Sequence, residues 1–335
     1  TITRGRSLRD DDSDLDDEDE EDNDGNEGVK NKFLTPKKEK PWELFQIPTE
    51  EPTIKKINLV YDINEIQLHP LAFRIQKDLS DKGYQVWINK KQVVGDEVLL
   101  PLITPGSIKR PNGSNLNDLI LARSNHFQIL PLIVSPYPFP LNTYKLGWMD
   151  IQDWQNPILY QNLLNQCTLA IEQYTEFDSP HQELFNFLKP LDFGAEASAL
   201  ALDFTGREWL YEEFDNWVTQ DDSRIFIITG NLGAGKSAII SQLAIKHPLS
   251  GAYFFCRNNW YSTLDATSFI TTLSAQLLTQ FPEFKSSLLQ STFYQNIHSF
   301  TSSFKFSDIP IDTLLHSLLL QPLSQVRGDT PLLLF

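Results

Sequence analysis

Cysteine and long apolar runs are scarce in this sequence. The 335 residues include only two cysteines, Cys167 and Cys256, which lie far apart in the chain. Two such residues supply neither a disulfide framework nor the ligands of a metal knuckle, and they fit a reducing compartment. No apolar stretch approaches the roughly 18 residues of a membrane-spanning helix, and the N-terminus is charged rather than apolar. The sequence therefore predicts a cytoplasmic protein with no membrane span and no signal peptide.

Positive charge is also in short supply. The chain has 28 Lys and Arg against 44 Asp and Glu, a formal net charge of -16. Thirteen of the acids lie between Asp10 and Glu27, in a stretch without Lys or Arg. Without that stretch, the net charge of the chain is only about -3. A nucleic-acid binder needs a cationic face to neutralise phosphates, and the rest of the chain offers no such excess. We therefore expect no nucleic-acid partner.

Residues 1–53 hold this charge in two blocks. The acidic run DDDSDLDDEDEEDNDGNEG precedes the basic run KNKFLTPKKEK, and neither contains much apolar surface. Such a segment cannot offset the conformational entropy lost on ordering, so we predict a disordered tail. Two roles stay open for it: a solubilising leader and a contact site for a basic partner.

The remaining residues have the composition of a folded protein and enough length for two α/β domains, each of which we expect to be doubly wound and three-layered. In residues 54–174 the apolar run KINLVYD precedes an amphipathic segment at 71–79 and the run YQVWIN, an alternation typical of βαβ units. Further strands are predicted in 98–103, 127–134 and 145–151, and further helices over 115–123 and 158–174. Residues 175–203 are interpreted as a linker with a single short helix.

The second domain is predicted to occupy residues 204–335. It begins with TGREWLYEEFDNWV, in which Leu210 and Phe214 share one helical face, and continues with RIFIIT (224–229), a candidate buried strand. A Gly-rich segment and an apolar helix follow directly. Strand, Gly-rich loop and helix in this order are the context that a phosphate-binding loop requires.

The Gly-rich segment satisfies the pattern G-x-x-x-x-G-K-[ST] at every fixed position. Its residues are Gly230, Asn231, Leu232, Gly233, Ala234, Gly235, Lys236 and Ser237. The glycines allow backbone N–H groups to turn toward a phosphate, and the following helix directs the positive end of its dipole at the same anion. Lys236 would reach the β- and γ-phosphates, and the Ser237 hydroxyl would bind Mg²⁺. The motif predicts binding of ATP or GTP with Mg²⁺.

Hydrolysis needs, in addition, a carboxylate after a second apolar strand. Residues 330–335 (TPLLLF) form a candidate for that strand, with no acid after it in the sequence. Asp265, Asp308, Asp312 and Asp329 do not follow apolar strands and are interpreted as helix caps and surface acids. No catalytic residue is therefore assigned, and we expect any ATP hydrolysis to belong to a longer protein of which this chain is a fragment.

Four segments of residues 204–335, in this order, resemble a NACHT-type P-loop NTPase: FTGREWL, TGNLGAGKSA, YFFCRNN and TLDATSFITTLSAQL. The resemblance implies a signal-transducing nucleotide switch that oligomerises on activation. It also implies that Gly206 and Arg207 lie near the adenine end of the nucleotide. Cys256, at the end of an apolar strand, is interpreted as a core residue.

Residues 54–174 resemble a TIR domain, of flavodoxin-like topology, in their first strand KINLVYD and in FQILPLIVSPYPFPLNTYKLGWMDIQDW. Some members of that family cleave NAD with a glutamate on the helix after the third strand. Leu119 stands at the matching position, and the adjacent Asp118 is rotated by about 100 degrees on a helix. The resemblance therefore implies a domain that contacts protein partners without cleaving NAD.

Three functions follow for testing. The leading hypothesis is a nucleotide-dependent signalling switch that binds ATP and Mg²⁺ and uses the TIR-like domain for protein–protein interaction. The alternatives are an NAD-cleaving TIR enzyme regulated by the NTPase module and a metabolic P-loop kinase. The absence of a carboxylate at Leu119 disfavours the first alternative, and the upstream GREWL segment disfavours the second.

Overall fold

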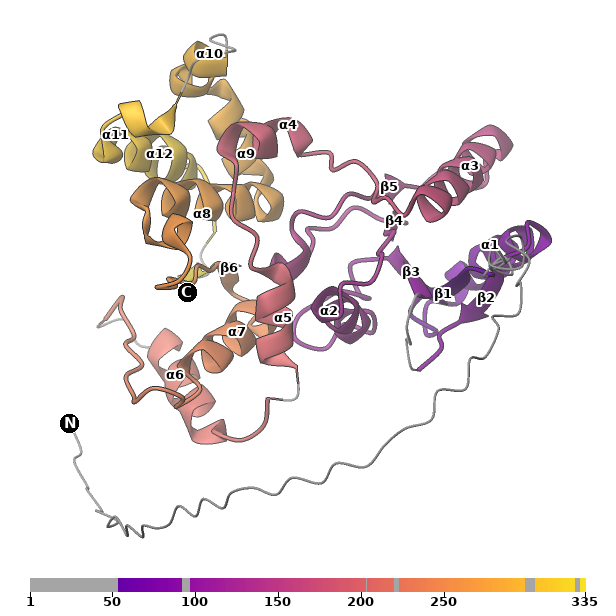
Figure 1. The fold of residues 1–335 in the computed structure, drawn as a ribbon, viewed down its shortest axis with the longest axis horizontal. Coiled ribbons are helices and arrows are strands. Elements are labelled where there is room, and N and C mark those ends of the chain that lie inside the picture. The colour runs from indigo at the N-terminus through magenta and orange to yellow at the C-terminus, as the bar shows by residue number, and fades with distance from the viewer. Residues whose placement is uncertain (1–53, 92–96, 203, 220–222, 299–304, 329–331) are drawn as a thin grey trace, which may run out of the picture. The chain divides into compact units, whose positions relative to one another are not determined.

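A computed structural model describes residues 54–91, 97–202, 204–219, 223–298, 305–328 and 332–335. The predicted tail at residues 1–53 lies outside this range. The described residues belong to one compact unit, which is α/β (Figure 1). Among them, no helix has the length and apolar character needed to cross a membrane.

The first part of the chain is built on a parallel sheet of five strands. They are β1 (Lys56–Val60), β2 (Gln85–Ile88), β3 (Glu97–Ile103), β4 (Leu132–Ile133) and β5 (Met149–Asp150). Their order is β2-β1-β3-β4-β5, with Ile57 beside both Val86 and Val98. This is the flavodoxin-like order, in which the direction of winding reverses between β1 and β3.

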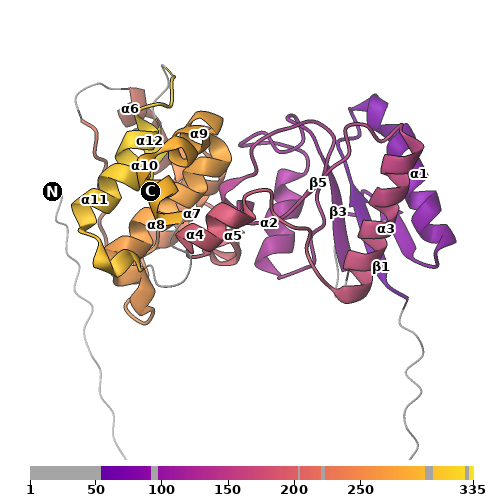
Figure 2. The ribbon, with the colours of Figure 1, turned by 90° about the horizontal axis from the view of Figure 1, so that it is seen from above.

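Helices cover both faces of this sheet. The connecting elements are η1 (Ile66–Leu68), α1 (His69–Asp81), α2 (Leu116–Ser124), η2 (Leu141–Thr143) and α3 (Pro157–Gln173). All seven residues of β3 are buried, as expected of a central parallel strand. Leu100 packs in the same cluster as α1 and α3, whereas Leu99 packs with α2. The predicted doubly wound, three-layer arrangement is confirmed for this part (Figure 2).

Two helices, rather than the single one expected, occupy the predicted linker. They are α4 (Gln182–Leu188) and α5 (Gly194–Ala201), and α5 packs between α2 and α7 (Lys236–Lys246) (Figure 1). The side of α5 that faces these helices carries small residues, so the helices approach closely. At Gly194 a Cβ atom would stand 2.1 Å from the carbonyl oxygen of Asn142. The segment is therefore a packed spacer and not a loose linker.

The second part is mostly helical. Besides α7 it contains α6 (Glu208–Thr219), β6 (Ser250–Ala252), η3 (Tyr261–Leu264), α8 (Ala266–Gln280), α9 (Pro282–Gln290), α10 (Thr292–His298), η4 (Phe306–Asp308), α11 (Ile311–Leu315), the π-helix η5 (His316–Leu320), α12 (Gln321–Leu323) and β7 (Leu333–Leu334). Strands β6 and β7 pair in parallel, which confirms the strand predicted in TPLLLF. Asp265 accepts a hydrogen bond from the Ser268 N–H at 2.9 Å and caps α8, as its interpretation as a cap requires.

Helix α8 lies at the centre of this part. Its ten residues from Ile270 to Thr279 are all buried, including several polar ones. Some of the polar side chains bond to other elements: Gln276 accepts from the Tyr253 N–H at 2.9 Å and donates to the Tyr253 carbonyl at 3.0 Å. This pair extends the hydrogen bonding of β6 beyond its last strand residue and attaches the strand to α8.

Several sequence predictions, in both parts of the chain, differ from the structure. Residues 225–229 are not a strand: they pair with neither β6 nor β7, and the side chains of Ile225 and Ile227 are 73% and 76% exposed. The predicted strands at 127–134 and 145–151 reduce to the two-residue β4 and β5. Cys256, predicted in the core, is exposed because the buried segment that continues from β6 ends at Phe255.

His181, at the start of α4, makes stability depend on pH. Its ring contacts those of Trp148 and Phe185 at centroid distances of 5.5 and 5.9 Å. Burial, with a smaller contribution from Lys285, lowers the pKa of His181 from 6.5 to about 4. The unfolded chain therefore binds this proton at a higher pH than the folded chain does, and stability is lost as pH falls from 6.5 toward 4.

We therefore expect the free energy of unfolding to fall between pH 7 and pH 5, and His181→Gln to reduce that fall. Urea unfolding followed by circular dichroism at the two pH values measures the difference. His126→Asn, at an exposed position, is the matched control and should keep the pH dependence of the unsubstituted chain. An equal pH dependence in His181→Gln would contradict the assignment.

Candidate functional site

The predicted phosphate-binding residues form an exposed loop that leads into α7. The helix forms where the sequence predicts it because Ile239, Leu243 and Ala244 recur at helical spacing and are buried. No side chain caps its N-terminus. The first turn of a helix has N–H groups without intrahelical acceptors, and here they face the loop rather than a capping residue. The loop and helix together offer donors to an anion.

Glycine is required at two positions of the loop by backbone conformation. Gly233 has φ of 76 degrees and Gly235 has φ of 82 degrees, values in the left-handed region that side chains disfavour. Between them, the Ala234 N–H donates to the Asn231 carbonyl at 3.1 Å and closes a tight turn. The turn returns the chain to the start of α7 and leaves Leu232 fully exposed at its tip.

Lys236 closes the loop with its side chain. Its Nζ donates to the carbonyl oxygens of Gly230 at 2.8 Å and Asn231 at 2.9 Å. Both acceptors are neutral, and no salt bridge of the described residues includes Lys236. The ammonium is thus held over the loop with its charge uncompensated, and a phosphate oxygen is the kind of acceptor that compensates it.

Ser237 follows in the first turn of α7, with its side chain exposed. Its carbonyl accepts from the Ser241 hydroxyl at 2.8 Å, and within the described residues its own hydroxyl has no protein partner. A hydroxyl in this place is free to bind a metal ion that a triphosphate also holds. No group of three or more His, Cys, Asp or Glu in the described part of the chain is arranged to hold a metal by itself.

Gly206 and Arg207 lie beside the loop, although they are far from it in sequence. Both have left-handed backbones, with φ of 83 and 66 degrees. The Arg207 guanidinium nitrogens lie 3.5 Å from where a Cβ on Gly235 would stand. The sequence placed this pair toward an adenine, and the structure brings Arg207 next to the phosphate loop. Non-glycine residues with positive φ are strained, and they cluster at functional sites. The positive φ of Arg207 is therefore consistent with a functional role for this residue.

An aromatic cluster around Phe214 holds α6 on α7. Phe214 contacts the rings of Phe226, His247 and Phe335 at centroid distances of 5.4 to 5.8 Å. Burial lowers the pKa of His247, while Asp215, 3.4 Å from its Nε2, opposes the change. Because Arg207 immediately precedes α6, the cluster fixes that arginine relative to the loop. The helical spacing of Leu210 and Phe214 predicted the apolar face, but no sequence signal marked His247.

The first part of the chain has no carboxylate at position 119. Leu119 is fully buried in the cluster between α2 and the sheet, so an ionised side chain there would be strongly unfavourable. The neighbouring Asp118 is partly buried, which raises its pKa. Glu65, which sequence reasoning did not single out, lies at the carboxyl edge of the sheet and bonds to the Thr104 hydroxyl.

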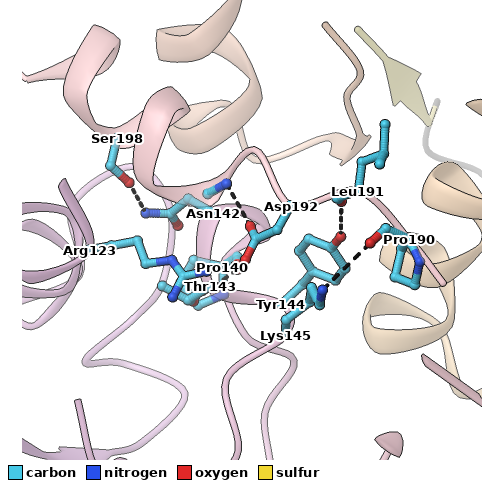
Figure 3. A network of polar contacts seen from close by, with 11 residues as sticks. Arg123, Pro140, Asn142, Thr143, Tyr144, Lys145, Pro190, Leu191, Asp192 and Ser198 are labelled. Carbon is cyan, nitrogen blue, oxygen red and sulfur yellow. Dashed lines mark hydrogen bonds and ion pairs between the residues drawn. The ribbon is translucent and has the colours of Figure 1, made fainter. Parts of the chain in front are cut away.

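A polar network joins the first part to α5 (Figure 3). Arg123 of α2 pairs with Asp192, and the Tyr144 hydroxyl donates to the Leu191 carbonyl at 2.6 Å. The Asn142 side-chain amide donates to the Ser198 hydroxyl at 2.9 Å. The network anchors both the start and the middle of α5, which in turn packs on α7.

A second contact reaches the same helix directly. Arg110 donates to the carbonyls of Ser250 at 3.1 Å and Ala244 at 3.5 Å, and to the Gln280 side-chain oxygen at 3.1 Å. Ala244 lies near the C-terminal end of α7, so this helix is held at the end opposite the loop. None of these contacts was foreseen from the sequence.

Comparison with known proteins gives one result for the second part. Residues 205–332 match the family model described as Nephrocystin 3, N-terminal. The matched segment includes Gly206, Arg207 and the whole phosphate-loop motif, and it covers well under half of the chain. Neither the curated proteins nor the solved structures contain a match.

Proposed function

We propose that this chain is a nucleotide-dependent signalling switch. Its loop at residues 230–237 binds ATP with Mg²⁺, and its first, TIR-like part contacts protein partners. The observation that supports nucleotide binding best is the meeting of two separate sequence elements. Lys236 of the loop and Arg207 of the upstream motif both present cations at one glycine turn, within the segment that matches the Nephrocystin 3 N-terminal model.

Different residues of the proposed site would bind different parts of the nucleotide. Backbone N–H groups at the start of α7 and the Lys236 ammonium would bind the β- and γ-phosphates, and Arg207 would add a second charge on the same side. Mg²⁺ would neutralise the remaining phosphate charge, held by the Ser237 hydroxyl and the nucleotide. The sequence assigns no catalytic carboxylate, so the proposal is for binding and not for hydrolysis.

Signalling is the part of the proposal that rests on the connection between the two parts. Helix α7 carries the loop at one end and receives Arg110 near the other, while α5 packs along its side. A structural change at the phosphate loop could therefore be transmitted to the TIR-like part through the packed contacts of α7 and α5. A metabolic kinase needs no such attachment.

Removing the Lys236 ammonium is the first test. We expect Lys236→Ala to weaken binding of ATP·Mg²⁺ roughly 10- to 100-fold, the size expected for a lost charge-assisted hydrogen bond. Isothermal titration calorimetry with the full chain measures the affinity. Lys246→Ala, in the last turn of the same helix, removes the same charge away from the loop and should bind normally. Absence of ATP binding by the unsubstituted chain would refute the proposal.

Arg207 provides the second test. Arg207→Gln removes the charge next to Gly235 and should weaken ATP·Mg²⁺ by about tenfold, with a smaller effect on adenosine, which lacks phosphates. Arg224→Gln changes an exposed arginine of the preceding segment and serves as the control. Equal weakening of ATP and adenosine would show that Arg207 acts on the base and sugar, where the sequence first placed it.

The TIR-like part should not cleave NAD. Because Leu119 is apolar and fully buried, no carboxylate is available there to stabilise the positive charge that develops on the ribose. Incubation of the full chain with NAD, with and without ATP·Mg²⁺, should release no nicotinamide above the buffer control by liquid chromatography. Release that depends on the protein would revive the enzymatic alternative.

A further inference from the structure

A cavity of about 240 Å³ lies in the first part of the chain, between the end of β5 and the first half of α3. Its lining residues come from the segment 149–166, all of which the structure describes. Strand β5 is at one edge of the sheet, and no described strand pairs with its outer side. The volume is below the roughly 300–1,000 Å³ of sites that enclose a free small molecule. It suits a single side chain that belongs to a larger partner.

The inner wall of the cavity is apolar. Ile151, Tyr160 and Leu163 line it and are only 5%, 2% and 2% exposed, because they also pack in the core between the sheet and α3. Leu159 lines it too and is 47% exposed, so apolar surface continues from the cavity to the solvent. Transfer of an apolar side chain from water onto this surface is favourable.

The outer wall carries two carboxylates. Asp150 and Asp153 line the cavity, and both residues are exposed. The Asp150 carboxylate accepts hydrogen bonds from the Gln152 backbone and side-chain amides at 3.0 and 2.9 Å, which are neutral donors. No salt bridge of the described residues includes either aspartate, and residues 146–180 contain no Lys or Arg. The negative charge at this wall is therefore available to a cation from outside.

The cation that approaches the cavity from α1 is already engaged. Arg74 stacks on the Tyr160 ring, with its guanidinium carbon 3.6 Å from the ring centroid. Its Nε lies 3.9 Å from the Asp78 carboxylate, which also accepts a hydrogen bond from the Tyr160 hydroxyl at 2.9 Å. Arg74 thus belongs to a contact between α1 and α3 and does not pair with the carboxylates of the outer wall.

We propose that this cavity is the docking site for a basic segment of a partner protein. One aromatic side chain of the partner enters the cavity against Ile151 and Leu163, and Lys or Arg residues beside it pair with Asp150 and Asp153. Aromatic side chains that fill pockets supply much of the binding energy of protein interfaces, and complementary charge at the rim adds specificity. The inference rests on the proposed function, in which the first part contacts protein partners, and it names the chemistry of that partner.

A short synthetic peptide is the probe: one tryptophan with two lysines on each side, carrying a fluorescent label. Its affinity for the full chain is measured by fluorescence anisotropy. It should bind about tenfold more tightly than the analogue with serine in place of tryptophan, since serine leaves the apolar wall uncovered. An increase in salt from about 50 to about 500 mM should weaken the peptide severalfold, because exposed ion pairs are screened.

Two substitutions in the chain test the two walls. Asp153→Lys should weaken the peptide about tenfold by charge reversal, whereas Asp81→Lys, at an exposed acid of the first part outside the cavity, should not. Leu159→Ser removes an apolar wall residue and should weaken the peptide about fivefold. Leu169→Ser, at a position of α3 that is 55% exposed and does not line the cavity, is its matched control. Circular dichroism checks that all four variants are folded.

Several results would overturn the docking site: no binding of the peptide, equal binding of the serine analogue, or unchanged binding in both Asp153→Lys and Leu159→Ser. Sedimentation velocity adds another, because a dimer that Asp153→Lys dissociates would make a second copy of the chain the occupant. ATP·Mg²⁺ titrated into the same samples separates the two proposals. Binding of ATP without binding of the peptide would reject this surface and leave the nucleotide part of the proposed function standing.

Discussion

The close packing of α5 between α2 and α7 is the constraint on which the positions of the other functional elements depend. Gly194 has no space for a Cβ atom, and Ala197 and Ser198 are fully buried. A larger side chain in this row would move α5 away from both neighbours, since packed interiors have little room to adapt. Because α7 begins at the phosphate loop, the same displacement would alter the relation between the loop and the first part of the chain.

Electrostatics acts on this framework at both ends of α7. Lys236 and Arg207 lie together at the N-terminal end, and Arg110 lies near the C-terminal end; none has a carboxylate partner among the salt bridges of the described residues. In a chain of net charge -16 this distribution does not reflect an excess of cations. At Lys236 and Arg110, hydrogen bonds to neutral oxygens hold a positive charge in place without neutralising it. An anion at either end would neutralise that charge.

The sequence predicted those features of the fold that depend on a local pattern of residues. The first strand, α1 and α3 were predicted within about two residues, because apolar residues recur there with a clear period. The left-handed φ values at Gly233 and Gly235 supply a physical reason for two of the three glycines in the loop at 230–237, and phosphate binding by this loop stays a prediction. Which elements pack against each other depends on the tertiary fold, and no local sequence pattern indicates it.

The failures have the same origin. The apolar composition of 225–229 predicted a buried strand, but a strand also needs a neighbouring backbone, and no described strand pairs with it. The small-residue run at 194–201 has weak amphipathic character, so the sequence predicted only one short helix in residues 175–203 and did not place it, although small side chains are what the position of α5 requires. Arg110 drew no attention because a lone arginine carries no spacing pattern. Its importance appears only when the fold brings it to α7.

The stiffness of helix α7 limits how far its N-terminal and C-terminal ends can move independently of each other. An α-helix rises 1.5 Å per residue, so the 11 residues of α7 span about 16 Å as one stiff element. A tilt or shift at Lys236 must then be accommodated along α5 and at the Arg110 contacts, because a well-packed helix does not compress. The hydrogen bond from Arg110 to Ala244 is 3.5 Å long, the longest of its three, and so the one that a small shift most easily breaks. Loss of that bond would leave an Arg110 N–H without its acceptor, so a shift at Lys236 that reached the far end of α7 would be opposed by the cost of the lost hydrogen bond.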